Sequence, residues 1–307
     1  MYVIITVDTE GDNLWSWKDG ENITTENTKY IPRFQDICED FGFYPTYLTN
    51  YEMAMDNRWV SFAKEKQRKG LCEIGMHLHA WNTPPIVNLE NRYGGNPYIT
   101  EYTKDIIEAK VQTMINLLSV RFECNIASNR SGRWATNAAY LNILRDYGIK
   151  VDCSVTPGLD LSGIPGRSAN CGNDYSRCNM GAYVIVDGLL EVPMTSMKTK
   201  TPIDGSLRQR IKTVIKGEIL WLRPIMNVRK LRYLSEKSLK KCDYVEFMVH
   251  SSELMPGGSP YFRDSDAVDM LFKRMKDLFS YLKGIGLSGM TLSEYNTTWR
   301  KSHNVTC

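Results

Sequence analysis

Two histidines, His77 and His79, stand one residue apart at the end of the apolar run 73–80. In an extended strand the side chains of residues i and i+2 project from the same face, so the two imidazoles can converge on one point. Two ligands of one metal ion must converge in this way. The pair therefore indicates either a metal site or two ordinary histidines at the end of a strand.

A second pair of polar side chains, Asp8 and Glu10, follows the apolar run 1–7 with the same spacing. Two neighbouring carboxylates repel one another unless a cation lies beside them. One carboxylate with two neutral imidazoles is a common ligand set for catalytic zinc and leaves a coordination position for water. Alone, the pair favours two carboxylates that cap a following turn; together with the two histidines it fits a divalent cation, and zinc suits these ligands best.

Two arginines, Arg130 and Arg133, lie in the polar segment 129–134. An arginine beside a carboxylate lowers the pKa of that carboxylate and fixes its orientation. Either arginine could also be a surface charge, and Arg133 is the easier of the two to place there.

A third histidine, His250, follows the apolar run 244–249. A lone histidine after such a run is usually structural, but at the mouth of a site with two other histidines it is a candidate general acid. Asp152 or Glu253 could orient its ring, and the residues leave this choice open.

Strand-like and helical patterns alternate along the chain, which favours parallel β/α units with functional groups at the carboxyl ends of the strands. The expected strands are 1–7, 43–49, 73–80, 123–128, 149–155, 244–249 and 287–292, with a hairpin around 187–188. The expected helices lie near 31–41, 57–69, 101–120, 136–147 and 264–284.

The composition, with 42% hydrophobic and 24% charged residues in 307, is that of an ordinary globular protein. No linker or repeat divides the chain, so we expect one domain over 1–307 with a basic helical insertion around 206–241. The net charge of +3 is too small to argue for nucleic acid. The eight cysteines form no CxxC pair, and we expect no disulfide framework. The sequence starts with no signal-peptide pattern, so we expect a cytoplasmic protein.

The segment 206–241 concentrates positive charge, with eleven Lys or Arg against two Glu. Apolar residues are interleaved with these cations. The pattern fits amphipathic helices packed on the main fold, or a patch that makes peripheral contact with an anionic membrane or a lipid-linked glycan.

Five motifs in order, each at a strand end, resemble the polysaccharide deacetylase family, the NodB homology domain of carbohydrate esterase family four. The resemblance runs from residue 1 to about 295 and rests on the segments 6–10, 73–77, 130–134, 151–154 and 248–251. It implies a distorted (β/α)7 barrel and metal-dependent hydrolysis of an N-acetyl group on a carbohydrate.

The resemblance also implies roles for individual residues. Asp8 matches the general base, Arg130 the arginine that orients this base, and His250 the general acid. Glu10 and His77 match metal ligands, with Glu10 serving because Thr9 occupies the position of the usual second aspartate.

The sequence departs from the family at two positions. The family has His-x-x-x-His, but Trp81 stands at the second histidine, so we expect His79 to replace it as the third metal ligand. Gly132 stands where a proline is usual. Another C–N amidase or deformylase, or a carbohydrate-binding protein without catalysis, are the alternative functions on this fold.

Overall fold

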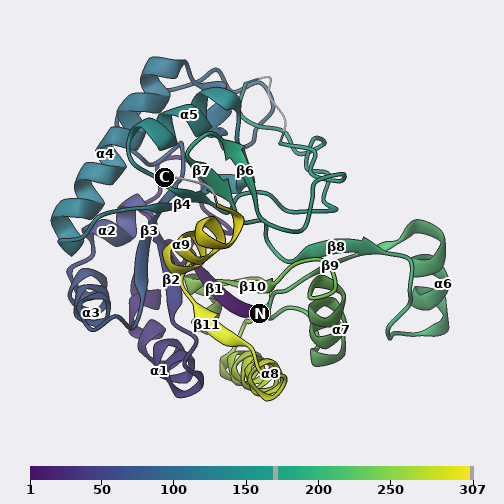
Figure 1. Ribbon diagram of the computed structural model, residues 1–307. Coiled ribbons are helices and arrows are strands. Elements are labelled where there is room, and N and C mark those ends of the chain that lie inside the picture. The colour runs from purple at the N-terminus through teal and green to yellow at the C-terminus, as the bar shows by residue number, and fades with distance from the viewer. Residues whose placement is uncertain (169–171, 305–307) are drawn as a thin grey trace.

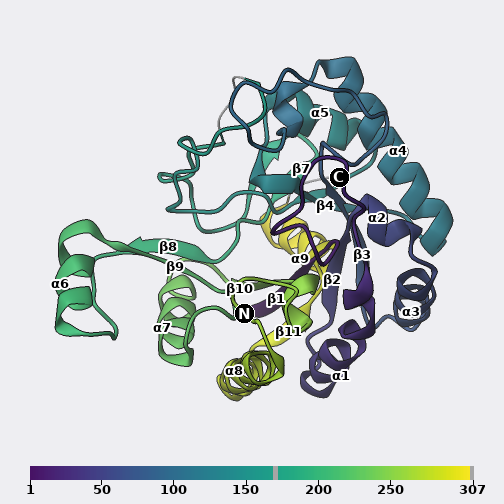
Figure 2. The same ribbon diagram turned by 180° about the vertical axis from the view of Figure 1, so that it is seen from behind.

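In the computed structural model, which describes residues 1–168 and 172–304, the first strand β1 (Tyr2–Thr9) is buried along nearly its whole length. A continuous apolar run is typical of a parallel strand with both faces covered. β1 lies second from one end of a curled sheet that forms a half-barrel, and helices surround the outer side of the sheet (Figure 1, Figure 2).

Seven neighbouring strands of this sheet form a parallel series, as expected from the alternating pattern. Their spatial order is β10 (Tyr244–His250), β1, β2 (Pro45–Thr49), β3 (Glu73–Leu78), β4 (Ser128–Ser131), β5 (Val151–Asp152) and β7 (Leu189–Glu191). β6 (Tyr183–Val186) forms the expected hairpin with β7, and β11 (Ser288–Met290) adds a further parallel strand beside β1.

Irregular chain links the two sides of the sheet where β7 and β10 do not pair. The Met194 N–H donates to the Val155 carbonyl (2.9 Å) after β7 and β5 have ended. The Leu222 N–H then donates to Thr195 (2.9 Å), and the Met248 N–H of β10 donates to Leu222 (3.1 Å). The sheet therefore curls into the distorted (β/α)7 barrel that the sequence predicted.

α1 (Ile31–Phe41) begins and ends where the sequence signals predict. α1 begins with Pro32 in its first turn and ends at Gly42, which has a φ of 69°. The other helices around the sheet are α2 (Tyr51–Met55), α3 (Asn57–Arg68), α4 (Lys104–Phe122), α5 (Ala138–Asp146), α7 (Val228–Ser238), α8 (Ser265–Gly284) and α9 (Leu292–His303), with α1 spanning Ile31–Phe41. Short 3-10 turns cover Glu26–Lys29, Ile99–Glu101, Gly132–Trp134 and Ser251–Leu254.

The basic segment is not helical throughout, contrary to the prediction. α6 (Leu207–Lys216) ends at Gly217, which has a φ of 79° and reverses the chain. The next four residues form the strand β9 (Glu218–Trp221), which pairs antiparallel with β8 (Ser196–Thr199). The two strands form a ribbon that carries α6 away from the barrel (Figure 1).

Another prediction from the sequence was wrong. The expected strand 123–128 starts only at Ser128, because α4 continues to Phe122 and Glu123 takes a left-handed conformation. The sequence analysis also assigned no element after Thr291, where α9 begins with a capping box that pairs Thr291 with Glu294. That Thr-x-x-Glu signal was present in the sequence.

Within the described ranges, no helix combines the length and the apolar character that crossing a membrane requires. The six cysteines described there are free thiols, while Cys171 and Cys307 lie outside the described residues.

The strands β2, β3 and β4 approach closely at Gly75, and a substitution there tests how tightly they pack under the site. A Cβ built on Gly75 of β3 would lie 2.7 Å from Leu48 Cδ2 and 3.0 Å from the Ser128 carbonyl oxygen. Gly75→Ala should therefore lower the free energy of unfolding by about 1–3 kcal/mol in urea denaturation. Gly284→Ala is the matched control, because no atom lies within 4 Å of its Cβ. Equal stability of the two variants would contradict this packing.

Candidate active site

The register of the parallel strands aligns four of the predicted site residues. Asp8 of β1 lies opposite His250 of β10, and His77 of β3 lies opposite Arg130 of β4. Both pairs stand at the carboxyl ends of their strands, which meet at one rim of the barrel. The alternation of strands and helices explains this convergence, since it makes the strands parallel.

Glu10 joins the two histidines in a buried cluster. Its Oε2 lies 3.5 Å from His77 Nε2 and 3.2 Å from His79 Nε2. Burial raises the pKa of Glu10, but hydrogen bonds with the two imidazoles outweigh it and hold the pKa well below its usual range. The ligand atoms of these three side chains all lie within 4.8 Å of one another, close enough to share one metal ion. In the described part of the chain, no other group of three His, Cys, Asp or Glu side chains meets this condition.

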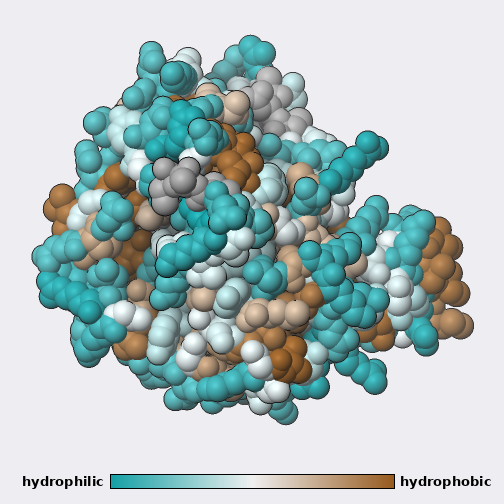
Figure 3. Space-filling model, in the orientation of Figure 1, coloured by the Kyte–Doolittle hydropathy of each residue, from teal (hydrophilic) through white to brown (hydrophobic). Residues whose placement is uncertain are grey.

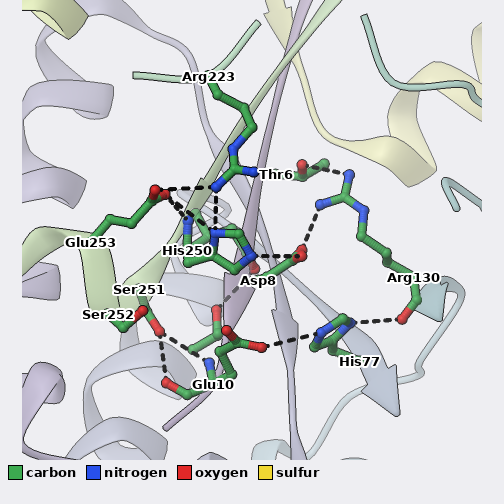
Figure 4. A network of polar contacts seen from close by, with 12 residues as sticks. Thr6, Asp8, Glu10, His77, Arg130, Arg223, His250, Ser251, Ser252 and Glu253 are labelled. Atoms are coloured by element: carbon green, nitrogen blue, oxygen red, sulfur yellow. Dashed lines mark hydrogen bonds and ion pairs between the residues drawn. The ribbon is translucent and has the colours of Figure 1, made fainter. Parts of the chain in front are cut away.

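The His77 ring is already oriented for metal binding. Its Nδ1–H donates to the Arg130 carbonyl oxygen (2.8 Å), so Nε2 is the ring nitrogen that faces Glu10 (Figure 4). A second hydrogen bond of this kind fixes the tautomer of most metal-binding histidines.

The His79 ring depends on the carboxamide of Asn50. Asn50 Nδ2 lies 2.7 Å from His79 Nδ1, while Asn50 Oδ1 accepts from the Tyr51 N–H. If Nδ2 donates, His79 keeps its proton on Nε2 and donates it to Glu10. Turning the carboxamide by half a rotation presents Oδ1 to the His79 Nδ1–H and frees Nε2 for a cation. The three side chains therefore fit a divalent metal in one of the two amide orientations.

The two departures from the family pattern meet at His79. Trp81 stacks on its ring with centroids 4.2 Å apart and planes 21° from parallel. Gly132 also lies against His79. A Cβ built on Gly132 would collide with His79 Cδ2 and would lie 2.6 Å from the Leu78 carbonyl oxygen. A proline at position 132 would therefore displace His79, so the glycine is required where His79 lies.

Arg130 is fully buried and links Asp8 to the interior of the barrel. Its Nη1 donates to Asp8 Oδ1 (2.5 Å), and its Nη2 donates to Thr6 Oγ1 (2.8 Å) and Glu246 Oε1 (2.7 Å). Burial raises the pKa of Asp8, but the Arg130 guanidinium together with His77 and His250 outweighs it and lowers the pKa overall. Burial raises the pKa of Glu246, against the opposing effect of the same guanidinium. The two carboxyl groups that share Arg130 therefore have pKa values shifted in opposite directions.

Glu253, and not Asp152, contacts His250. Its Oε2 lies 3.3 Å from His250 Nδ1 and accepts from the His250 N–H (2.9 Å). Asp152 instead accepts from the side chains of Asn129 and Ser154. The His250 Nε2 points towards Asp8 Oδ2, 3.9 Å away (Figure 4).

The sequence analysis did not identify Arg223, which is also in contact with His250. Arg223 Nη2 lies 3.0 Å from His250 Nδ1 and donates to Glu253 Oε1 (3.1 Å). Arg223 directly follows β9 and Leu222, inside the basic segment. Its charge was not distinguishable there from ten other cations, and only the fold brings it to the site.

A cavity of about 300 Å³ opens above these residues. Trp15 forms one wall, with its ring edge-on to His250 at 5.1 Å between centroids. Trp81 and Arg133 also line it, and Arg133 has a left-handed backbone with a φ of 57°. The Arg133 guanidinium lies over the Tyr98 ring, 3.8 Å from its centroid. Arg133 therefore packs on Tyr98 at the edge of the cavity, and Arg130, not Arg133, contacts Asp8.

Solved structures share this fold. No protein-family model and no curated protein matches the sequence. A protein described as a polysaccharide deacetylase of Mycobacterium smegmatis is 13% identical over 99% of this chain and 91% of that one, with a TM-score of 0.59. A protein described as a glycoside hydrolase/deacetylase of Parabacteroides distasonis is 12% identical over 98% and 71%, with a TM-score of 0.60.

The same fold also occurs in a 4-alpha-glucanotransferase of Thermococcus litoralis, which is 12% identical over 97% of this chain and 38% of that one, with a TM-score of 0.51. At these identities the similarities establish the fold, in agreement with the resemblance that the motifs indicated. The chemistry has to be argued from the site, because one fold supports several reactions.

The amide orientation of Asn50 predicts how metal binding responds to substitution. Asn50→Asp leaves only acceptor oxygens beside His79 Nδ1, so zinc should bind at least as tightly as in the wild type. Asn50→Leu removes the partner, and affinity should fall by about 10–100-fold in calorimetric titration of the metal-free protein. Equal affinities in both variants would show that Asn50 does not select the tautomer of His79.

Glu52 predicts a pH dependence of stability. It accepts from the Gly11 N–H (2.7 Å) and from Asn82 Nδ2 (2.6 Å), and burial raises its pKa from 4.5 to about 7. Between these values the unfolded chain loses this proton while the folded chain keeps it, so the contribution of Glu52 to stability falls as the pH rises. The melting temperature of Glu52→Gln relative to wild type should therefore rise from pH 4.5 to about 7. A constant difference across this window would contradict the assignment.

Proposed function

We propose that the protein is a metal-dependent hydrolase that removes an N-acetyl group from a carbohydrate. The observation that supports this best is the cluster of Glu10, His77 and His79 beside Asp8, at the rim of a barrel shared with proteins described as deacetylases. The donor set of one carboxylate and two imidazoles suits zinc.

The bound metal would polarise the acetyl carbonyl and lower the pKa of a water molecule. Asp8 then accepts the proton of the attacking water. Arg130 occupies Oδ1 of Asp8 and leaves Oδ2 on the side of His250. Because Arg130 lowers the pKa of Asp8, this group is a carboxylate at neutral pH and able to take a proton.

His250 donates a proton to the leaving amine, which is otherwise a poor leaving group. Glu253 holds the Nδ1 side of the ring and directs Nε2 towards the cavity. Arg223 holds Glu253 in turn. His250 Nε2 and Asp8 Oδ2 lie 3.9 Å apart and both residues line the cavity, so the proposed proton donor and proton acceptor are available to the same substrate.

A non-catalytic carbohydrate-binding protein is the second candidate. The contact between Asn50 Nδ2 and His79 Nδ1 favours it, because this orientation turns a His79 proton towards Glu10. Trp15 and Trp81 would then provide stacking surfaces for a sugar ring in the same cavity.

Substitution of the three predicted catalytic or metal-binding groups tests the hydrolase. His77→Ala should lose zinc in elemental analysis, and Asp8→Asn and His250→Ala should keep zinc but lower kcat by about 10²–10⁴-fold on N-acetylated oligosaccharides. His303→Ala is the matched control, because this histidine is exposed at the end of α9 and stacks on Trp299.

The outcomes separate the candidate functions. Wild-type turnover in all variants would exclude the mechanism. Sugar binding by the wild-type protein without turnover, in the presence of zinc, would indicate the non-catalytic alternative. Turnover of N-formyl compounds or other amides in place of N-acetyl sugars would indicate a different amidase or a deformylase.

A further inference from the structure

α6 stands apart from the rest of the molecule. It lies at the tip of the ribbon formed by β8 and β9, away from the helices that surround the sheet (Figure 1, Figure 2). The helix is nevertheless well defined, because Ser206 and Gln209 form a capping box at its start and Gly217 ends it. The local sequence therefore defines a short helix that does not pack on the barrel.

The outer face of α6 is apolar. Residues of this face recur at i, i+4, i+7 and i+8, which places them on one stripe of a helix. They are Leu207, Ile211, Val214 and Ile215, which are 75%, 51%, 51% and 67% exposed. Thr213, on the opposite side of α6, is buried. Figure 3 shows this apolar surface on α6, at the tip of the ribbon, where it faces away from the barrel.

Positive charges flank the stripe. Arg208 and Arg210 adjoin it on either side of the helix, whereas Lys212 and Lys216 lie on the opposite face. All four are exposed, and α6 contains no Asp or Glu. The nearest carboxylates along the chain, Asp204 and Glu218, pair instead with Lys230 of α7, at 3.2 Å and 2.5 Å. The cations of α6 are therefore available to an external anion.

We propose that α6 is a membrane-docking helix that lies in the interface of an anionic lipid bilayer. Its apolar stripe would enter the boundary between head groups and acyl chains, and the flanking cations would contact lipid phosphates. A second copy of the chain fits this face less well, because pairing two α6 helices would bring Arg208 and Arg210 of both copies together without a carboxylate of α6 between them. This inference is independent of the proposed enzymatic activity.

Flotation with lipid vesicles tests the docking helix. The full chain should bind phosphatidylcholine vesicles that contain phosphatidylglycerol and should not bind pure phosphatidylcholine vesicles. Ile211→Asp combined with Ile215→Asp should abolish binding. Arg208→Gln and Arg210→Gln should each weaken binding about five-fold, since a cation near an anionic surface contributes about 1 kcal/mol.

Val120→Asp is the matched control, because Val120 is 76% exposed and lies on α4, away from α6 and the ribbon that carries it. It should bind like the wild type. Failure of the wild-type protein to bind the anionic vesicles would overturn the proposal, as would unchanged binding of the Ile211 and Ile215 variant. A dimer in light scattering that this variant converts to a monomer would assign the face to a second copy instead.

Discussion

The buried guanidinium of Arg130 is the constraint on which the centre of the molecule depends. It reaches from β4 across the interior of the sheet to Asp8 and Thr6 of β1 and to Glu246 of β10, and its Nε donates to the Cys153 carbonyl oxygen (3.0 Å). β2 and β3 lie between β4 and β1 in the sheet. One side chain can bridge these strands only because the sheet is curled.

An unpaired charge in the interior costs several kcal/mol, so the carboxylates that pair with Arg130 contribute to stability as well as to the site. Removing Asp8 would leave the guanidinium with one fewer acceptor in a place that water does not reach. The same contact sets the charge of Asp8, because it lowers the pKa of that carboxyl against the effect of burial. Stability and the proposed base chemistry therefore share one interaction.

The candidate metal cluster shows how a shorter histidine spacing can be accommodated. His77 and His79 share a strand face, and the space that His79 needs is provided by the absence of a side chain at Gly132. Trp81 then stacks on His79 instead of supplying a ligand. The departures from the family pattern are thus linked through direct contacts of His79.

The sequence by itself determined the parallel barrel and the residues at its rim. Alternating patterns define the strands, and the period of two in residues 8–10 and 77–79 places each pair on one face, whatever the rest of the chain does. Only the tertiary structure decided that Glu253 and not Asp152 orients His250, and that Arg223 reaches it. These contacts join segments that are distant in sequence, and no local periodicity encodes them. The same reason applies to the basic segment, where Gly217 and the pairing with β8 convert an expected helix into a strand and leave α6 exposed.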